Sequence, residues 1–223
     1  YTLSLHDTLP IYRELCLYKV STAAHPLDEY KIVLDNLCNA KCQELADRCA
    51  ALIDREDITL GGIVTSVQTR FSAKTNKPWG IVTLEDFEGS GELVLFGDDW
   101  LNLNGKFIEG AAVYVTGKMQ QRFRNSEQKE FKVTNVELLQ TIKEKSIDRI
   151  TISMITDMLD EQIVNDLCEI INETPGSTKL FFQLRDSQGK NHVLLRSKTT
   201  GIDVRYTLID YIEHHDMLDY KIN

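Results

Sequence analysis

The hydrophobic period of this chain changes at Ile58, and that change restricts what the middle of the chain can fold into. Upstream, apolar residues recur at helical spacing, whereas from Ile58 onward apolar and polar residues alternate. The alternation predicts five short strands, at Ile58–Val64, Trp79–Leu84, Glu92–Phe96, Ala112–Met119 and Phe131–Leu138. Strands of this length bury one face only when the sheet packs or closes on itself.

The connections between these runs favour one closed topology. Turn-forming stretches, "KTNKP", "EDFEGSG" and "RFRNSEQ", separate the first two strands, the second and third, and the fourth and fifth. The stretch "GDDWLNLNGKFIEG" between strands three and four is too long for a hairpin and suits a short helix capped by Asp98 or Asp99 and closed by Gly105. Five strands with a helix after the third are typical of the OB-fold barrel, which we expect at residues 58–140.

The flanking segments predict two further units, so the expected fold class is mixed β and α/β. Residues 12–57 form a helical segment in which Asp28 to Ile53 reads as one amphipathic helix or a broken pair. After the charged joint "TIKEKSIDR", residues 147–223 predict a small α/β domain. Its expected elements are a strand at Arg149–Ser153, a helix at Asp157–Asn172, a hairpin of Lys179–Arg185 with His192–Arg196, and a helix at Arg205–His214. Residues 1–11 match no periodic template and are interpreted as a foreign leader.

Composition limits where the protein works and how it meets other molecules. A net charge of -9 and a pI near 5.1 exclude a protein that is basic all over, so any nucleic-acid contact must be local. Residues 58–140 are the least acidic third, with nine Lys/Arg against ten Asp/Glu. Five cysteines, an odd number, do not form a secreted disulfide framework, and no apolar run reaches a membrane span. These features predict a soluble protein of the reducing cytoplasm.

Several residues are of types found in catalytic or metal sites, but their spacing does not fit such a site. Cys38, Cys42 and Cys49 would share one helix face, but a fourth zinc ligand is not evident, and we expect buried thiols. His25 has no partner placed by the sequence, and the pair Asp98-Asp99 is expected at a helix start rather than around magnesium. The "GSG" at residues 89–91 lacks the following helix of a phosphate loop and predicts a hairpin corner. We therefore expect no catalytic residue and no metal site in this chain.

Cations and aromatic residues gather in the two loops that flank the open face of an OB-fold. Such a mixture tracks a phosphate backbone and stacks bases. The alternative is that the lysines merely solvate turns and that Trp79 belongs to the core. The predicted nucleic-acid-binding residues are Arg70, Phe71, Lys74, Lys77 and Trp79 from the first loop region, and Arg122, Phe123, Arg124 and Lys129 from the second.

The stretch "GGIVTSVQTRFSAKTNKPWGIVTLEDFEGSGELVLFGDDW", residues 61–100, closely resembles the OB domain of the family-C replicative DNA polymerases, the bacterial DNA polymerase III alpha subunits. "HPLDEY", residues 25–30, is similar to that family's signature just upstream of the barrel, and the region from Asp148 resembles its C-terminal domain. The resemblance covers nearly everything after residue 12. It implies a DNA-directed DNA polymerase, a nucleotidyltransferase using magnesium, of which this chain represents the C-terminal part.

In that family the OB domain lies near single-stranded template, and the terminal domain contacts the clamp-loader tau subunit among other replisome subunits. The resemblance therefore implies template DNA and tau as partners. The family's palm with its catalytic aspartates has no counterpart here, so the chain alone is not expected to polymerise and needs no cofactor. One alternative is a purely protein-docking module without significant nucleic-acid binding. Another is an OB protein of the transfer-RNA-binding or synthetase type.

Overall fold

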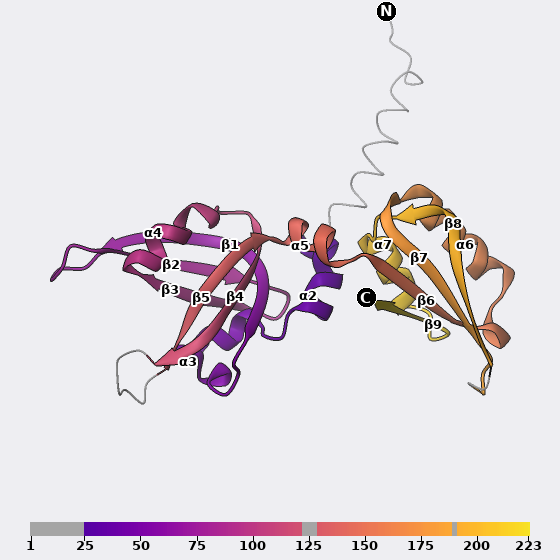
Figure 1. Cartoon of the computed structure of the whole chain (residues 1–223), viewed down its shortest axis with the longest axis horizontal. Helices are drawn as coiled ribbons and strands as arrows, with labels where there is room; N and C mark the ends of the chain where they lie inside the picture. Colours follow the sequence, from indigo (N-terminus) through magenta and orange to yellow (C-terminus); the bar gives the residue numbers. More distant parts are fainter. Residues whose placement is uncertain (1–24, 122–128, 189–190) are drawn as a thin grey trace, which may run out of the picture.

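The structure is a computed structural model that describes residues 25–121, 129–188 and 191–223 (Figure 1). The expected leader at residues 1–11 lies outside the described residues. Within the described part, an antiparallel barrel and a second, smaller sheet lie on either side of a group of short helices (Figure 1).

The barrel contains the five expected strands in the order β3-β2-β1-β4-β5, all antiparallel. They are β1 (Ile58–Phe71), β2 (Pro78–Glu85), β3 (Ser90–Phe96), β4 (Ala112–Gln121) and β5 (Lys129–Leu138). The helix α4 (Gly97–Leu103) and the 3-10 turn η5 (Asn104–Lys106) connect β3 to β4. This arrangement confirms the OB-fold barrel.

Two details of the barrel differ from the sequence prediction. Strand β1 continues seven residues past Val64, so Arg70 and Phe71 belong to a strand rather than to a loop. The cap prediction for α4 was wrong, because the N-cap is Phe96 and both Asp98 and Asp99 lie inside the first turn. Carboxylates at the start of a helix still interact favourably with its dipole.

The segment upstream of the barrel is divided into short pieces instead of one amphipathic helix. They are η2 (Asp28–Tyr30), α2 (Lys31–Leu37), η3 (Cys42–Leu45), α3 (Ala46–Cys49) and η4 (Ala50–Leu52). Helix α2 ends because Cys38 is extended and the next two amides, of Asn39 and Ala40, both donate to the carbonyl of Thr59 on β1. The prediction that three cysteines share a helix face was therefore wrong.

The pieces after this break close one end of the barrel. Ala40, Cys42, Leu45, Cys49 and Leu52 are buried in the same apolar cluster as the strands. The amide of Cys42 donates to a carboxylate oxygen of Asp86 at 2.7 Å, which fixes η3 to the β2–β3 corner. The upstream segment is thus part of the barrel core.

The second sheet has the order β8-β7-β6-β9 and carries two helices. Its elements are β6 (Arg149–Ile155), η6 (Thr156–Met158), α6 (Glu161–Glu173), β7 (Pro175–Arg185), β8 (His192–Ile202), α7 (Tyr206–Glu213) and β9 (Leu218–Ile222). β6 and β7 are parallel across α6, whereas β7–β8 and β6–β9 are antiparallel. The mixed α/β class is confirmed, while the domain boundaries stay predictions.

Three features of this part were missed or misplaced by the sequence prediction. Strand β9 and helix α5 (Leu139–Ser146) were not expected. Helix α6 begins at Glu161 rather than Asp157, because Asp160 accepts a hydrogen bond from the Ile163 amide at 2.8 Å and so caps the helix.

Helices α2 and α5 lie between the barrel and the second sheet (Figure 1). Leu27, Val33 and Leu139 are fully buried in one cluster with Ile150 and Ile152 of β6. The ammonium of Lys143, on α5, lies 3.5 Å from the Asp203 carboxylate and 3.8 Å from that of Glu29. The "HPLDEY" stretch therefore packs against the second sheet as well as preceding the barrel.

Replacing Gly91 with alanine tests whether η3 is a fixed part of the barrel. A Cβ at Gly91 would lie 2.0 Å from the backbone oxygen of Cys42, so the substitution must displace η3. We expect the free energy of unfolding, measured by urea denaturation, to fall by about 1–3 kcal/mol. Gly105→Ala is the matched control, because nothing lies within 4 Å of its added carbon, and it should change stability by less than about 0.5 kcal/mol. Equal stability of both variants would contradict the packing of η3 on Gly91.

Candidate nucleic-acid interface

Trp79 points away from the barrel interior. Burial alternates along β2, with Gly80, Val82 and Leu84 buried and the intervening residues only partly covered. Gly80 faces the buried Trp100, since a Cβ at Gly80 would lie 2.3 Å from the Trp100 ring. The interpretation of Trp79 as a core residue therefore does not hold.

An outward row of one cation and two aromatic rings crosses β1, β2 and β3. Trp79 pairs with Arg70 on one side and with Phe96 on the other. The Arg70 guanidinium carbon lies 5.6 Å from the centre of the Trp79 ring, and the Trp79 and Phe96 rings are 5.8 Å apart with an interplanar angle of 28°. The Arg70 guanidinium also donates to the side-chain oxygen of Gln68 at 3.0 Å, which fixes its position.

The next row of the same face is apolar and partly exposed. Ile81 pairs with Gln68 and with Val94, and Val94 is 41% exposed. Phe96 is 48% exposed, although it lies at the end of a strand that belongs to the barrel core. The outer face of β1–β2–β3 therefore presents flat apolar groups beside a held cation, a surface that suits stacked bases and a phosphate.

The β1–β2 hairpin extends this surface past the barrel on the side away from the second sheet (Figure 1). The Ser72 amide donates to the Lys77 carbonyl at 2.9 Å, and Asn76 takes the left-handed conformation with φ of 52°. Lys74 and Lys77 are exposed in this turn and have no carboxylate within ion-pair distance among the described residues. Phe71 is 65% exposed, but it is adjacent to Arg70 on the strand and so faces the opposite side of the hairpin.

The second predicted loop region is only partly visible. Arg122, Phe123 and Arg124 lie outside the described residues. Lys129, at the start of β5, donates to the carbonyl of Ile53 at 2.9 Å. The convergence of the two loops on one rim therefore stays a prediction.

Phe96, Val94 and Gln68 complete the outer face but were not among the predicted site residues. The signal for Val94 and Phe96 was present in "GELVLF", where Leu93 and Leu95 are buried and their neighbours must point outward. Gln68 could not be placed from the sequence, because a register shift between Val64 and Ser66 changes which residues of β1 face outward.

The remaining candidates for chemistry have structural partners. The Nδ1 of His25 accepts a hydrogen bond from the Leu27 amide at 3.2 Å, and its ring packs on Phe87. Asp99 forms an ion pair with Lys132 at 3.4 Å. Gly89, in the "GSG" corner, donates its amide to Asp86 at 3.1 Å. Among the described residues, no three His, Cys, Asp or Glu side chains are grouped as metal ligands.

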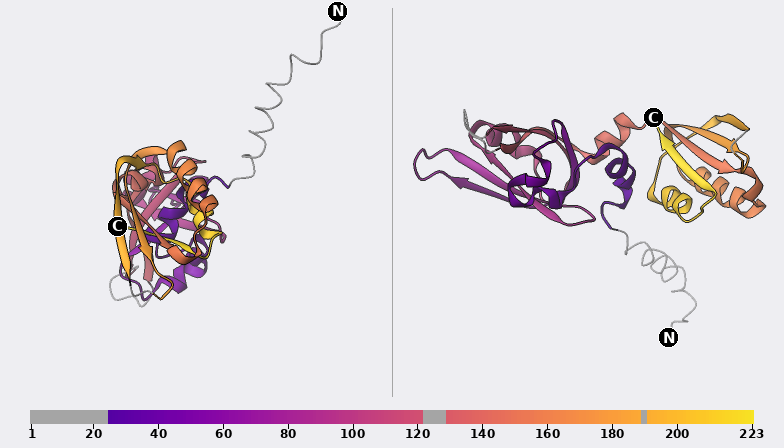
Figure 2. Two further views of the ribbon diagram at one scale, coloured as in Figure 1. Left: turned by 90° about the vertical axis from the view of Figure 1, so that its right-hand side faces the viewer. Right: turned by 90° about the horizontal axis from the view of Figure 1, so that it is seen from below.

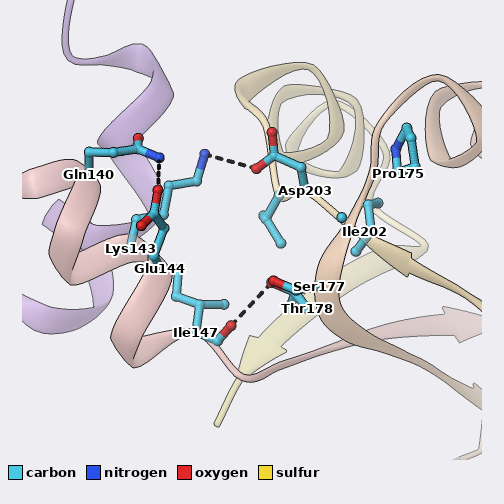
Figure 3. Close-up of a pocket in the computed structure, with 11 residues that line it drawn as sticks. Gln140, Lys143, Glu144, Ile147, Pro175, Ser177, Thr178, Ile202 and Asp203 are labelled. Atoms are coloured by element: carbon cyan, nitrogen blue, oxygen red, sulfur yellow. Dashed lines mark hydrogen bonds and ion pairs between the residues drawn. The ribbon is translucent and has the colours of Figure 1, made fainter.

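A pocket of about 360 Å³ opens between α5 and the second sheet (Figure 3). Lys143 reaches across it to Asp203, and Thr178 donates to the Ile147 carbonyl at 3.1 Å. Burial opposes the ionisation of Asp203, but hydrogen bonding to Arg205 and the charge of Lys143 outweigh it and lower the pKa of that carboxyl. The charges of Lys143 and Asp203 thus neutralise each other. Their ion pair connects α5 to the second sheet across the pocket and leaves neither charge unpaired for a ligand.

Comparisons with known protein families match two separate stretches of the chain. Residues 58–139 match the family of OB-fold nucleic acid binding domains of the tRNA anti-codon type, and residues 150–223 match the C-terminal domain of the DNA polymerase III alpha subunit. In the described residues, no helix is long and apolar enough to cross a membrane.

Two curated relatives are both named DNA polymerase III subunit alpha. The chain is 25% identical over 221 residues to the DNA polymerase III subunit alpha of Borreliella burgdorferi, a match covering 97% of this chain and 18% of that protein. It is 29% identical over 102 residues to the subunit of Saccharopolyspora erythraea, covering 45% of this chain and 8% of the relative. A crystal structure of a mitochondrial single-stranded DNA binding protein of S. cerevisiae matches 37% of this chain and 94% of its own, at 16% identity and a TM-score of 0.28.

The half-buried thiol of Cys38 and the buried thiol of Cys42 predict a specific labelling pattern. Burial raises the pKa of Cys38 to about 12, with the Lys41 ammonium opposing only part of the rise, and burial raises the pKa of Cys42 still further. At pH 8.5 the thiolate fraction of Cys38 is then on the order of 0.03%. We expect iodoacetamide to label the exposed Cys168 in the folded protein and to reach Cys38 and Cys42 only after urea is added, as read from peptide masses. Equal labelling of Cys38 and Cys168 without urea would show that the Cys38 thiol is accessible in the folded protein.

Proposed function

Because the chain belongs to the DNA polymerase III alpha subunit family, of which it carries the OB-fold domain and the C-terminal domain, we propose that the barrel binds single-stranded template DNA. The chain spans 18% of the length of the Borreliella relative, so DNA synthesis and its magnesium chemistry are activities that we assign to the whole subunit. Asp99, one of the two adjacent aspartates, forms an ion pair with Lys132, and the described residues contain no group of three potential metal ligands. The role proposed for this region is to hold DNA, without catalysis of its own.

The row of Arg70, Trp79 and Phe96 is the observation that carries this proposal. Its two rings are already stacked at 5.8 Å and are partly exposed, so a base can extend the stack without rearranging the strands. Stacking of a base on an aromatic side chain contributes about 1–3 kcal/mol and does not depend strongly on base identity. Arg70 supplies a charge for the adjoining phosphate.

The exposed hairpin and the second loop would guide the strand on either side of this row. Lys74 and Lys77 have no carboxylate partner among the described residues, so binding a phosphate there would break no ion pair with them. We propose Arg122, Phe123, Arg124 and Lys129 as the opposite edge of the path. About three or four phosphate contacts would give a slope of log affinity against log salt near -2 to -3.

Fluorescence anisotropy with a labelled oligothymidylate tests the proposal. Trp79→Ala should weaken binding by about 5- to 150-fold, since it removes one stacking platform. Arg122→Ala with Arg124→Ala should flatten the salt slope by about 1.4, two phosphate contacts at 0.7 each. Phe87→Ala is the matched control, because Phe87 is also a partly exposed ring, 45% accessible, but lies at the β2–β3 corner. Wild-type affinity of Trp79→Ala and an unchanged slope in the double arginine variant would together remove the proposal.

A second function, docking of another replisome subunit, is favoured by the edge of the second sheet. β8 is one of the two edge strands, and its consecutive residues Val193, Leu194 and Leu195 are 54%, 57% and 47% exposed. An apolar edge strand of this kind can pair with a strand of another chain. We propose that this edge receives the partner, and the family resemblance points to the clamp-loader tau subunit. If the barrel does not bind DNA, this proposal reduces to a chain whose role is protein docking alone.

Charged substitutions on the edge test the docking role separately from DNA binding. Val193→Asp with Leu195→Asp should weaken capture of purified tau by at least about tenfold, because pairing would bury two carboxylates. Ile108→Asp with Met158→Asp is the matched control, since both side chains are similarly exposed, at 64% and 51%, and lie outside β8. Tau binding is measured by surface plasmon resonance with the chain immobilised. Undiminished capture by the β8 variant would rule out this edge as the docking site.

A further inference from the structure

One face of the second sheet is left uncovered by its helices. The apolar residues of α6 and α7 pack in one cluster with Ile150, Ile152 and Met154 of β6, which alternate along the strand and share one face. Figure 2 shows the helices of this part on the same side of the sheet. Arg149, Thr151, Ser153 and Ile155 therefore point to the opposite side, which we call the open face.

The register places five cations on the open face. Phe181 of β7 pairs with Thr151 on one side and with Arg196 of β8 on the other, and Thr151 pairs in turn with Lys221 of β9. The cations of this face are Arg149, Lys179, Arg185, Arg196 and Lys221. Asp219 is the one acidic residue that the register of the described strands places there. The open face is therefore basic, although residues 147–223 as a whole carry a net negative charge.

Two guanidiniums converge on the ring at its centre. The guanidinium carbons of Arg149 and Arg196 lie 5.5 Å and 6.0 Å from the centre of the Phe181 ring. Neither has a carboxylate within ion-pair distance among the described residues. Like charges held near one ring without a counter-charge repel each other, so a bound anion would stabilise the arrangement.

Arg185 adds an unmet hydrogen-bonding demand at one end of this face. Its Nε is buried and has no acceptor among the described residues. A buried N–H donor without an acceptor destabilises the arrangement of the side chain that carries it.

We propose that the open face of β8-β7-β6-β9 is a second binding surface for single-stranded DNA, separate from the outer face of the barrel. The Phe181 ring and the guanidinium planes supply stacking surfaces for bases, and the surrounding cations contact the phosphates. Gln183 lies one row further along and offers its side-chain amide to base edges, and the buried hydroxyl of Ser153 holds that amide by donating to its oxygen at 3.3 Å. An acidic peptide would satisfy the charges but would make no use of the ring.

Oligothymidylate binding by the whole chain tests this surface while the barrel site is disabled. In the Arg70→Ala/Trp79→Ala background, binding should persist, and adding Arg149→Ala with Arg196→Ala should abolish it and flatten the salt slope by about 1.4. Phe181→Leu, which keeps an apolar side chain, should weaken it by about 5-fold or more. Lys106→Ala with Lys145→Ala removes the same charge elsewhere and should leave affinity within about twofold. If the barrel variants instead abolish all binding, the second surface is wrong while the barrel proposal stands.

A measurement on the unaltered protein keeps the proposal testable if a variant fails to fold. Amide resonances of Arg149, Phe181 and Arg196 should shift in NMR spectra when oligothymidylate is added, and polyglutamate of equal charge should shift them far less. Unmoved resonances at saturating oligonucleotide would overturn the proposal. Equal shifts with polyglutamate, together with wild-type affinity of Phe181→Leu, would show a surface for acidic chains in general and would also overturn it.

Discussion

The double pairing of β1 is the constraint on which the rest of this structure depends. Residues 58–63 of β1 pair with β4, and residues 63–71 pair with β2, so one strand belongs to both halves of the barrel. The strand must bend between the two ladders, and the register shift between Val64 and Ser66 lies at that bend. Gly61 and Gly62, just before it, leave room for the upstream segment, since a Cβ at Gly61 would lie 2.4 Å from the Leu34 side chain.

The bend in β1 affects two regions at once: the joint to the second sheet and the outward row that contains Trp79. Before it, the small residues of β1 let α2 and η3 approach, and α2 in turn packs with α5 and the second sheet. After it, the strand continues beyond the core and carries Arg70 to the outward row with Trp79. A change that straightened β1 would therefore disturb both the joint to the second sheet and the proposed DNA path.

The sequence predicted those elements whose signal is local, and missed those that depend on contacts between distant segments. Alternating apolar residues located all five barrel strands, because a strand with one buried face reveals its period. The helical spacing of Cys38, Cys42 and Cys49 predicted a continuous helix that does not form. The chain is extended after α2 because backbone amides there donate to the carbonyl of Thr59. Strand β9 comes at the end of the sequence and pairs with β6 at the start of the same sheet, and the five residues "LDYKI" alone do not indicate this pairing. The open face was invisible for the same reason, because Arg149, Phe181 and Arg196 come from three separate strands.

The net charge of -9 is compatible with the two proposed DNA-binding faces, because charge acts over short distances in salt. The Debye length is about 10 Å at 0.1 M ionic strength, so a phosphate responds mainly to the charges on the face that it touches. In the second sheet, acidic residues such as Glu161 and Glu169 belong to α6, which covers the face opposite to Arg149 and Arg196. Acids on the helical side and cations on the open side oppose each other across the sheet. Such a distribution favours a DNA strand lying along the open face over one lying along the helices. The apolar residues Val193, Leu194 and Leu195 of β8 suit a partner of different chemistry.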